Sequence, residues 1–204
     1  SIYFFREKII SGKNIAQGEL IMLKFKCSNS VKSVLLLVSI LLIIASMSFT
    51  VIAVDYPFTI KDDLGIEITM EEEPERLISL APSITELLYS IGLGDRIVAV
   101  TDYANYPEEA KNKDTVGSIT DPSIEKIVSL KPDLVFAAGI NKQETLTKLR
   151  SLDIKVAAFA PATIDETLSL MKKVGKLTNN EENTREVVTN LYLKLAKIID
   201  AVDK

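Results

Sequence analysis

The stretch Asp121 to Gly139, DPSIEKIVSLKPDLVFAAG, constrains the fold more than any other part of the sequence. Its first half predicts a helix that begins at Asp121 and Pro122, because aspartate is a favoured N-cap and proline suits the first helical position. Pro132 ends that helix. Residues 134–138, LVFAA, then show no polar alternation, which is typical of a strand buried on both faces in a parallel sheet. A helix that leads into a buried strand is half of a βαβ unit.

The same alternation of short apolar strands and amphipathic helices recurs along the chain. Two S/T-x-x-E patterns, Ser83–Glu86 and Thr163–Glu166, predict capping boxes at helix starts. Two β-like runs at 58–60 and 66–69 predict a hairpin before the repeats, and residues 181–202 predict one long helix after them. The fold class that we predict is therefore α/β, a Rossmann-like parallel sheet flanked by helices, preceded by a short β-hairpin and followed by a long helix.

Charge and composition exclude several functional classes. Residues 55–204 hold 18 Lys and Arg against 26 Asp and Glu, for a net charge of −8, so we expect no nucleic-acid partner. The sequence has no histidine, which removes the commonest general base and metal ligand. Its one cysteine, Cys27, precedes the predicted domain, so that domain has no disulfide. We predict no catalytic residues and no metal site.

Residues 22–54 have the layout of a targeting segment. Lys24, Lys26 and Lys32 precede a run without charges at 33–54. Such a segment is a cleaved secretory signal or a retained membrane anchor, and both alternatives place the following residues outside the cytoplasm, secreted or anchored at the membrane. Residues 1–21 carry no clear pattern and precede Met22, so we interpret them as an upstream extension that is not native mature protein.

Two loops are candidates for ligand binding. Gly92-Leu93-Gly94 resembles part of a dinucleotide fingerprint, but it follows a helix and precedes a strand, so we interpret it as a tight turn. Residues 101–107, TDYANYP, directly follow a predicted strand. Ligands of open α/β sheets bind at the carboxyl ends of the strands, so this second loop is the stronger candidate.

Three stretches together resemble the periplasmic-binding-protein family that delivers cobalamin and iron complexes to ATP-binding-cassette (ABC) importers. They are RLISLAPSITELLYSIGLGDRIVAVTDYANYPEEA, VGSITDPSIEKIVSLKPDLVFA and LRSLDIKVAAFAP. The resemblance implies two α/β lobes that face each other across a cleft and are joined by one long helix. Residues 55–178 would be the N-terminal lobe and residues 179–204 the start of the helix between the lobes. The second lobe is absent, so we expect the sequence to be a fragment.

The resemblance also implies roles for individual residues. Tyr103 corresponds to an aromatic side chain that stacks on the ligand, and Glu125 to an exposed carboxylate that docks on the permease. The other residues that would line the cleft are Pro82, Ser83, Asp102, Ile119, Gly139, Ile140 and Asn141.

The resemblance implies an extracytoplasmic binding component and not an enzyme. Its partners would be a small metal-complex ligand, an importer permease with its ATPase, and the membrane if the N-terminal segment stays uncleaved. A corrinoid is favoured over a ferric siderophore or haem, and no covalent cofactor is required. Ile119 and Ala138 replace tryptophans frequent in cobalamin binders, and only Lys113 and Lys142 could replace the arginines of siderophore receptors. The alternatives are a nucleotide-binding α/β enzyme domain and a surface-anchored interaction domain.

Overall fold

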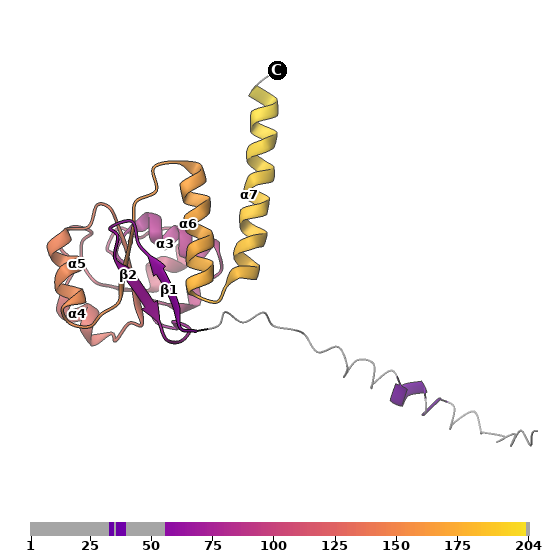
Figure 1. Ribbon diagram of the computed structural model, residues 1–204, viewed down its shortest axis with the longest axis horizontal. Helices are drawn as coiled ribbons and strands as arrows, with labels where there is room; N and C mark the ends of the chain where they lie inside the picture. The colour runs from indigo at the N-terminus through magenta and orange to yellow at the C-terminus, as the bar shows by residue number, and fades with distance from the viewer. Residues whose placement is uncertain (1–32, 35, 40–55, 203–204) are drawn as a thin grey trace, which may run out of the picture. The chain divides into compact units, whose positions relative to one another are not determined.

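The computed structural model describes residues 33–34, 36–39 and 56–202 (Figure 1). The chain divides into two units, Ser1–Val51 and Ile52–Lys204, and all the labelled elements belong to the second. Apart from residues 33–34 and 36–39, which are helical, the predicted signal or anchor at 22–54 lies outside the described residues. Within the described ranges, no helix combines the length and the apolar character needed to cross a membrane.

A five-stranded parallel sheet forms the centre of the second unit and confirms the predicted fold class. Its strands follow the order β5-β4-β3-β6-β7, and every neighbouring pair is parallel. The chain passes from β3 to β4 and then to β5 at one edge of the sheet. It then returns to β6, on the other side of β3, and continues to β7 at the opposite edge. The point where the direction reverses therefore lies between β3 and β6. The strands are β3 (Leu77–Ser79), β4 (Ile97–Val100), β5 (Asp114–Thr115), β6 (Leu134–Ala138) and β7 (Val156–Phe159).

Helices cover both faces of this sheet (Figure 1). One hydrophobic cluster joins the sheet to α3, α6 and α7, and a second cluster joins the opposite face to α4 and α5. Two short 3₁₀ helices, η1 (Gly94–Arg96) and η2 (Glu108–Asn112), flank β4. Because η1 lies between α3 and β4, the tight turn predicted at Gly92–Gly94 is confirmed. The helices are α3 (Pro82–Ser90), α4 (Ile124–Ser129), α5 (Gln143–Arg150), α6 (Ile164–Leu177) and α7 (Glu181–Val202).

One predicted helix start is confirmed. At α6 the Thr163 hydroxyl accepts a hydrogen bond from the backbone N–H of Glu166, and the Glu166 carboxylate accepts one from the N–H of Thr163. The capping box predicted at this position is therefore correct.

Two predicted helix starts are wrong. The N-cap of α4 is Ser123 and not Asp121, because Pro122 pairs with Gly117 in an isolated β-bridge before the helix begins. The N-cap of α3 is Ala81, with Pro82 in the first turn and no side-chain cap. The predicted Ser83–Glu86 box therefore does not form, because the helix starts two residues earlier than the pattern indicated.

The predicted hairpin forms as β1 (Phe58–Lys61) and β2 (Glu67–Met70) and packs against the β7 edge of the sheet. The side chain of Asp62, at its turn, is fully buried. Its carboxylate accepts hydrogen bonds from the Arg150 guanidinium at 2.9 Å and from the Ala158 N–H at 3.2 Å. The N–H of Asp63 donates to the Ala158 carbonyl at 3.0 Å. The turn thus occupies hydrogen-bonding groups that an edge strand would otherwise leave open.

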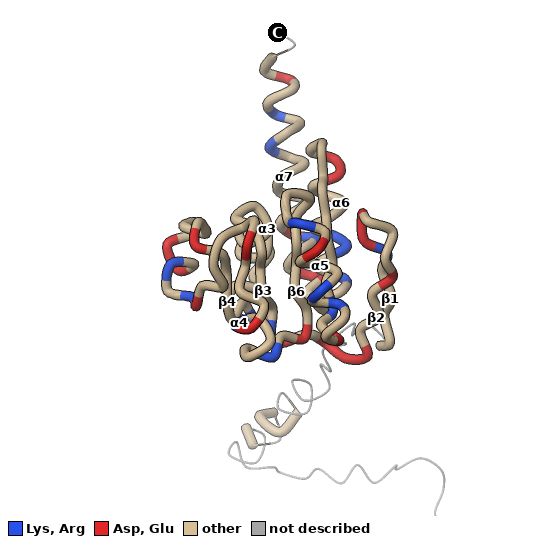
Figure 2. The backbone as a smooth tube through the Cα atoms, turned by 90° about the vertical axis from the view of Figure 1, so that its left-hand side faces the viewer, with Lys and Arg blue, Asp and Glu red and all other residues tan. Residues whose placement is uncertain are grey.

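The long helix α7 begins against α6 and then extends past it (Figures 1 and 2). The two helices meet closely at Gly175, where a Cβ atom would collide with the Thr184 side chain. Val188 is still buried in the core, whereas Ile198, Ile199 and Val202 are exposed by 59%, 60% and 78%. The apolar face of α7 therefore continues beyond the surface that the described unit covers.

Candidate functional site

A groove lies at the carboxyl ends of β3, β6 and β7, beside the point where the strand order reverses. This is where ligands of open α/β sheets bind. The cavity has a volume of about 660 Å³, and we call it the strand-end groove. It is lined by Ser83, Ile84, Glu86, Leu87, Ser90, Tyr106, Ala138, Gly139, Ile140, Phe159, Ala160, Pro161, Thr167, Leu170, Met171 and Leu191.

Helix α3 forms one wall of the strand-end groove because of the way it begins. Ser83, Glu86, Leu87 and Ser90 recur at helical spacing and all line the cavity. With Ala81 as the N-cap, the side chains of Ser83 and Glu86 are not used in a capping box. Ser83, one of the expected residues, lines the groove, whereas Pro82 is half-buried in the first turn of α3 and does not line it.

The end of β6 forms the floor of the groove. Gly139 and Ile140, two of the expected residues, line the cavity, and Ile140 is 63% exposed. A Cβ atom at Gly139 would lie 2.8 Å from the Cβ of Ala160, so the tips of β6 and β7 approach closely. Only glycine permits this approach without a shift of the backbone.

Asn141, the third expected residue of this loop, is buried and hydrogen-bonded within the protein. Its Oδ1 accepts a bond from the Ala138 N–H at 2.7 Å. Its Nδ2 donates to the carbonyls of Leu80 at 3.0 Å and Ile119 at 2.8 Å. The amide therefore holds together the ends of β3 and β6 and the loop after β5. Ile119 is half-buried and does not line the strand-end groove.

The loop after β4 presents two tyrosines to solvent. Tyr103 and Tyr106 are each 67% exposed, and buried Ala104 anchors the loop between them. Tyr106 lines the strand-end groove, whereas Tyr103 and the exposed Asp102 do not. Tyr106 was not among the residues expected to line the cleft, although it is the second aromatic residue of the same TDYANYP loop, a signal that could have indicated it.

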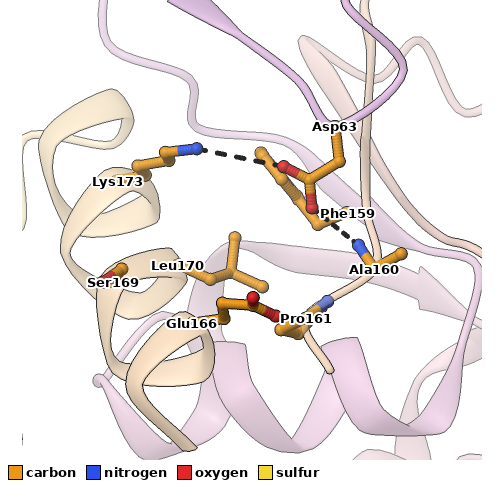
Figure 3. Close-up of a pocket in the computed structure, with 8 residues that line it drawn as sticks. All are labelled: Asp63, Phe159, Ala160, Pro161, Glu166, Ser169, Leu170 and Lys173. Carbon is orange, nitrogen blue, oxygen red and sulfur yellow. Dashed lines mark hydrogen bonds and ion pairs between the residues drawn. The ribbon is translucent and has the colours of Figure 1, made fainter. Parts of the chain in front are cut away.

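A second hollow, the hairpin hollow, adjoins the groove between the β1–β2 turn and α6 (Figure 3). Its volume is about 440 Å³. Asp63 accepts a hydrogen bond from the Ala160 N–H at 2.8 Å, and its other oxygen lies 3.9 Å from the Lys173 ammonium. The hollow shares Phe159, Ala160, Pro161 and Leu170 with the groove.

Charged residues are few in the strand-end groove. Among the residues of its lining, Glu86 is the one Asp, Glu, Lys or Arg. Lys113 and Lys142 line neither the groove nor the hairpin hollow. Burial raises the pKa of Tyr89, and the negative charges of Glu109 and Asp95 raise it further, but this tyrosine lies outside the groove lining.

The serine hydroxyls of the groove lining are not paired with its carboxylate. The Ser90 hydroxyl donates to the Leu87 carbonyl at 2.7 Å. Within the described part of the chain, neither Ser83 nor Ser90 hydrogen-bonds to Glu86, so no nucleophile is paired with a base there. Among the residues that the structure describes, no group of three or more His, Cys, Asp or Glu is placed to hold a metal ion.

Glu125, the expected docking residue, lies in the first turn of α4 and is exposed. Helix α4 runs between two parallel strands, so its first turn lies at the same carboxyl edge of the sheet as the groove. It belongs, however, to the opposite face of the sheet from α3 and α6. The Glu125 carboxylate is therefore exposed at a place separate from the strand-end groove.

Comparison of the sequence with known proteins shows a family for this chain. A family model described as "Periplasmic binding protein" matches residues 77–204. The "Vitamin B12-binding protein" of Yersinia pestis (strain Pestoides F) is 42% identical over 113 residues, which cover 55% of this chain and 40% of the relative. The chain thus spans about two fifths of the length of the curated relatives that it matches.

Solved structures share the fold. The periplasmic vitamin B12 binding protein BtuF of Vibrio cholerae matches with a TM-score of 0.57 and 35% identity, over 61% of this chain and 49% of that chain. A possible iron-binding (periplasmic solute-binding) protein from Staphylococcus epidermidis matches with a TM-score of 0.59 and 33% identity, over 64% and 52%. A periplasmic heme binding protein from Pseudomonas aeruginosa has a TM-score of 0.59 at 19% identity, over 62% and 46%, and supports the fold alone.

Proposed function

Since the chain belongs to the periplasmic binding protein family, as the match over residues 77–204 shows, we propose that it binds a metal complex outside the cytoplasm for delivery to an ABC importer. The predicted family is confirmed. The observation that carries the functional proposal is the strand-end groove, which lies at the reversal point of the sheet. Its volume of about 660 Å³ falls within the range of about 300–1,000 Å³ that is typical of small-molecule sites.

The groove suits a large ligand with a flat apolar body. Aliphatic side chains and Phe159 form most of the lining, and Tyr106 stands at the rim with 67% of its surface exposed. Burial of apolar ligand surface and stacking on an aromatic ring would supply the affinity. The groove is one wall of the proposed cleft, in which Tyr103, Asp102, Pro82 and Ile119 would contribute from its margin.

Among metal complexes we favour a corrinoid over a ferric siderophore or haem. The curated relative named above is described as vitamin B12-binding, and one solved structure at 35% identity has the same description. A relative at 33% identity is described as possibly iron-binding, so an iron complex remains the second candidate ligand. No covalent cofactor is needed for either ligand.

The proposed location is extracytoplasmic, as the family description implies. Secretion or anchoring would depend on residues 22–54, and the proposed partners are the importer permease and its ATPase. The rival hypotheses find less support in the site. An enzyme would need a nucleophile paired with a base, and the serines of the groove lining are not hydrogen-bonded to Glu86; a pure interaction domain would not need a concave apolar site at the strand ends.

The test is a titration of the full chain with cyanocobalamin, ferrioxamine and haemin. Intrinsic tyrosine fluorescence and calorimetry measure the binding of each compound. Cyanocobalamin should bind most tightly. Ser83→Trp should abolish this binding by filling the groove, whereas Ser129→Trp, an exposed position on α4 across the sheet, should not affect it. Absence of binding by all three compounds, or equal effects of the two tryptophans, would contradict the proposal.

A further inference from the structure

The charge of the strand-end groove is set by Glu86. This residue is exposed on α3, one turn after the start of the helix, and it lines the cavity. Within the described part of the chain, no cation lies close enough to form an ion pair with its carboxylate. The rest of the lining consists of apolar side chains and the hydroxyls of serine, threonine and tyrosine. An isolated negative charge therefore faces any ligand that occupies the groove.

The adjoining hairpin hollow adds to this negative field. Its lining contains two carboxylates, Asp63 and Glu166, and one ammonium group, Lys173. The Lys173 ammonium lies 3.9 Å from the Asp63 carboxylate, so the charges of this pair cancel (Figure 3). The groove and the hollow together thus hold three carboxylates against one cation. A ligand that spans both cavities would therefore meet more carboxylates than cations along this wall.

On the basis of the function proposed above, we infer that Glu86 is a specificity-determining residue, which favours metal complexes with N–H donors at their rim and disfavours those with carboxylates. A carboxylate only accepts hydrogen bonds, and it forms charge-assisted bonds with amide and ammonium donors. A ligand carboxylate at the same place would be repelled and would lose its hydration without a compensating donor.

Two probes separate this effect from recognition of the macrocycle. Dicyanocobinamide carries amides around a corrin ring, and dicyanocobyrinic acid carries carboxylates around the same ring. The wild-type full chain should bind the amide probe more tightly than the acid probe. In Glu86→Lys the dissociation constant of the acid probe divided by that of the amide probe should fall by roughly tenfold at low ionic strength. This change should become smaller as salt is added.

Glu144→Lys is the matched control, because it makes the same charge change at an exposed position of α5, on the opposite face of the sheet. It should leave the ratio unchanged. Glu86→Gln, which removes only the charge, should shift the ratio in the same direction by a smaller factor. This variant keeps the inference testable if the lysine variant does not fold.

The outcomes distinguish the two proposals. If both probes bind and Glu86→Lys and Glu86→Gln leave the ratio unchanged, charge selection by Glu86 is wrong while the proposed binding function stands. If neither probe binds to the wild-type chain, the corrinoid function fails and the inference fails with it. A ratio that shifts equally in Glu144→Lys would assign selectivity to net charge and would also overturn the inference.

Discussion

At the scale of single residues, a buried amide determines the shape of the groove floor. Asn141 is 8% exposed and satisfies three backbone groups from three different segments. Loops that meet at a sheet edge have no ladder of their own to hold them, so side-chain bonds to the backbone replace it. The residue that the family resemblance assigned to the ligand therefore also holds the site together.

Asn141→Ala should lower the free energy of unfolding by about 2–4 kcal/mol, because it leaves the Ala138 N–H and two carbonyls without their partner. Urea unfolding followed by circular dichroism measures this loss. Asn105→Ala, at an exposed loop position, should change the stability by less than about 0.5 kcal/mol. An equally small effect at Asn141 would show that the loops are held by other contacts.

Two tyrosines of one loop should contribute differently to ligand binding. Tyr106 lines the strand-end groove and Tyr103 does not, although both are exposed to the same extent. Tyr106→Ala should weaken cyanocobalamin binding by about 1–3 kcal/mol, the range for an aromatic ring stacked on a planar ligand. Tyr103→Ala should weaken cyanocobalamin binding by a similar amount only if the cleft extends to Tyr103. Calorimetric titration of both variants compares them, and two unchanged affinities would exclude stacking by this loop.

At the scale of elements, the hairpin is joined to the sheet through the buried carboxylate of Asp62. Asp62 connects its own turn, Arg150 of α5 and Ala158 of β7. The neighbouring Asp63 accepts a hydrogen bond from the N–H of Ala160, whose loop lines both the groove and the hairpin hollow. The turn of a two-stranded hairpin thereby fixes the loop that follows β7, and the hairpin supports the site as well as the sheet edge.

Asp62→Ala should destabilise the protein by about 3–5 kcal/mol, because it leaves the largely buried guanidinium of Arg150 without its carboxylate partner. Asp62→Asn keeps an acceptor for the turn N–H groups and should cost less. Thermal and urea unfolding give both values, with Asp95→Ala at an exposed position as the control. If the alanine variant matched that control, the ion pair would not hold the hairpin.

At the scale of the whole molecule, α7 presents an apolar surface that the described unit leaves open. Leu193, Ile198, Ile199 and Val202 are each more than half exposed. Several exposed apolar side chains along one helix favour association with another surface. The full chain should therefore self-associate as its concentration rises.

Sedimentation equilibrium measures this association. Ile199→Glu should weaken it by roughly tenfold or more, because a charge in an apolar contact must be desolvated on association. Asn190→Glu adds the same charge to the same helix at a polar, exposed position and should have little effect. Equal effects of both changes would place the contact elsewhere than on the apolar face.

The proposed docking of the chain on a permease is a second property of the whole molecule. Glu125 is exposed at the carboxyl edge of the sheet and lies outside the groove lining. Glu125→Ala should leave cyanocobalamin affinity unchanged and slow its uptake into vesicles that contain the importer. Glu144→Ala, an exposed acid of α5, should not slow uptake. Unaltered transport by the Glu125 variant would exclude the docking role.

Local sequence determined much of this protein. Residues 134–138 form the buried strand that their apolar run predicts, and Thr163 and Glu166 form the predicted capping box. The hairpin and the long last helix also form where their patterns indicated. These features depend on residues at most a few positions apart, for which period and capping chemistry are sufficient.

Only the tertiary structure decided which side chains meet in the site. The position of β3 next to β6, the place of Tyr106 in the groove lining, the burial of Asn141 and the isolation of Glu86 all depend on segments far apart in the chain. One error was local. The N-cap of α3 is Ala81 and not Ser83, because Pro82 takes the first helical position, which suits proline. Local sequence leaves several loop conformations of similar energy open, and packing between distant segments selects among them. The groove therefore forms only when the sheet is assembled.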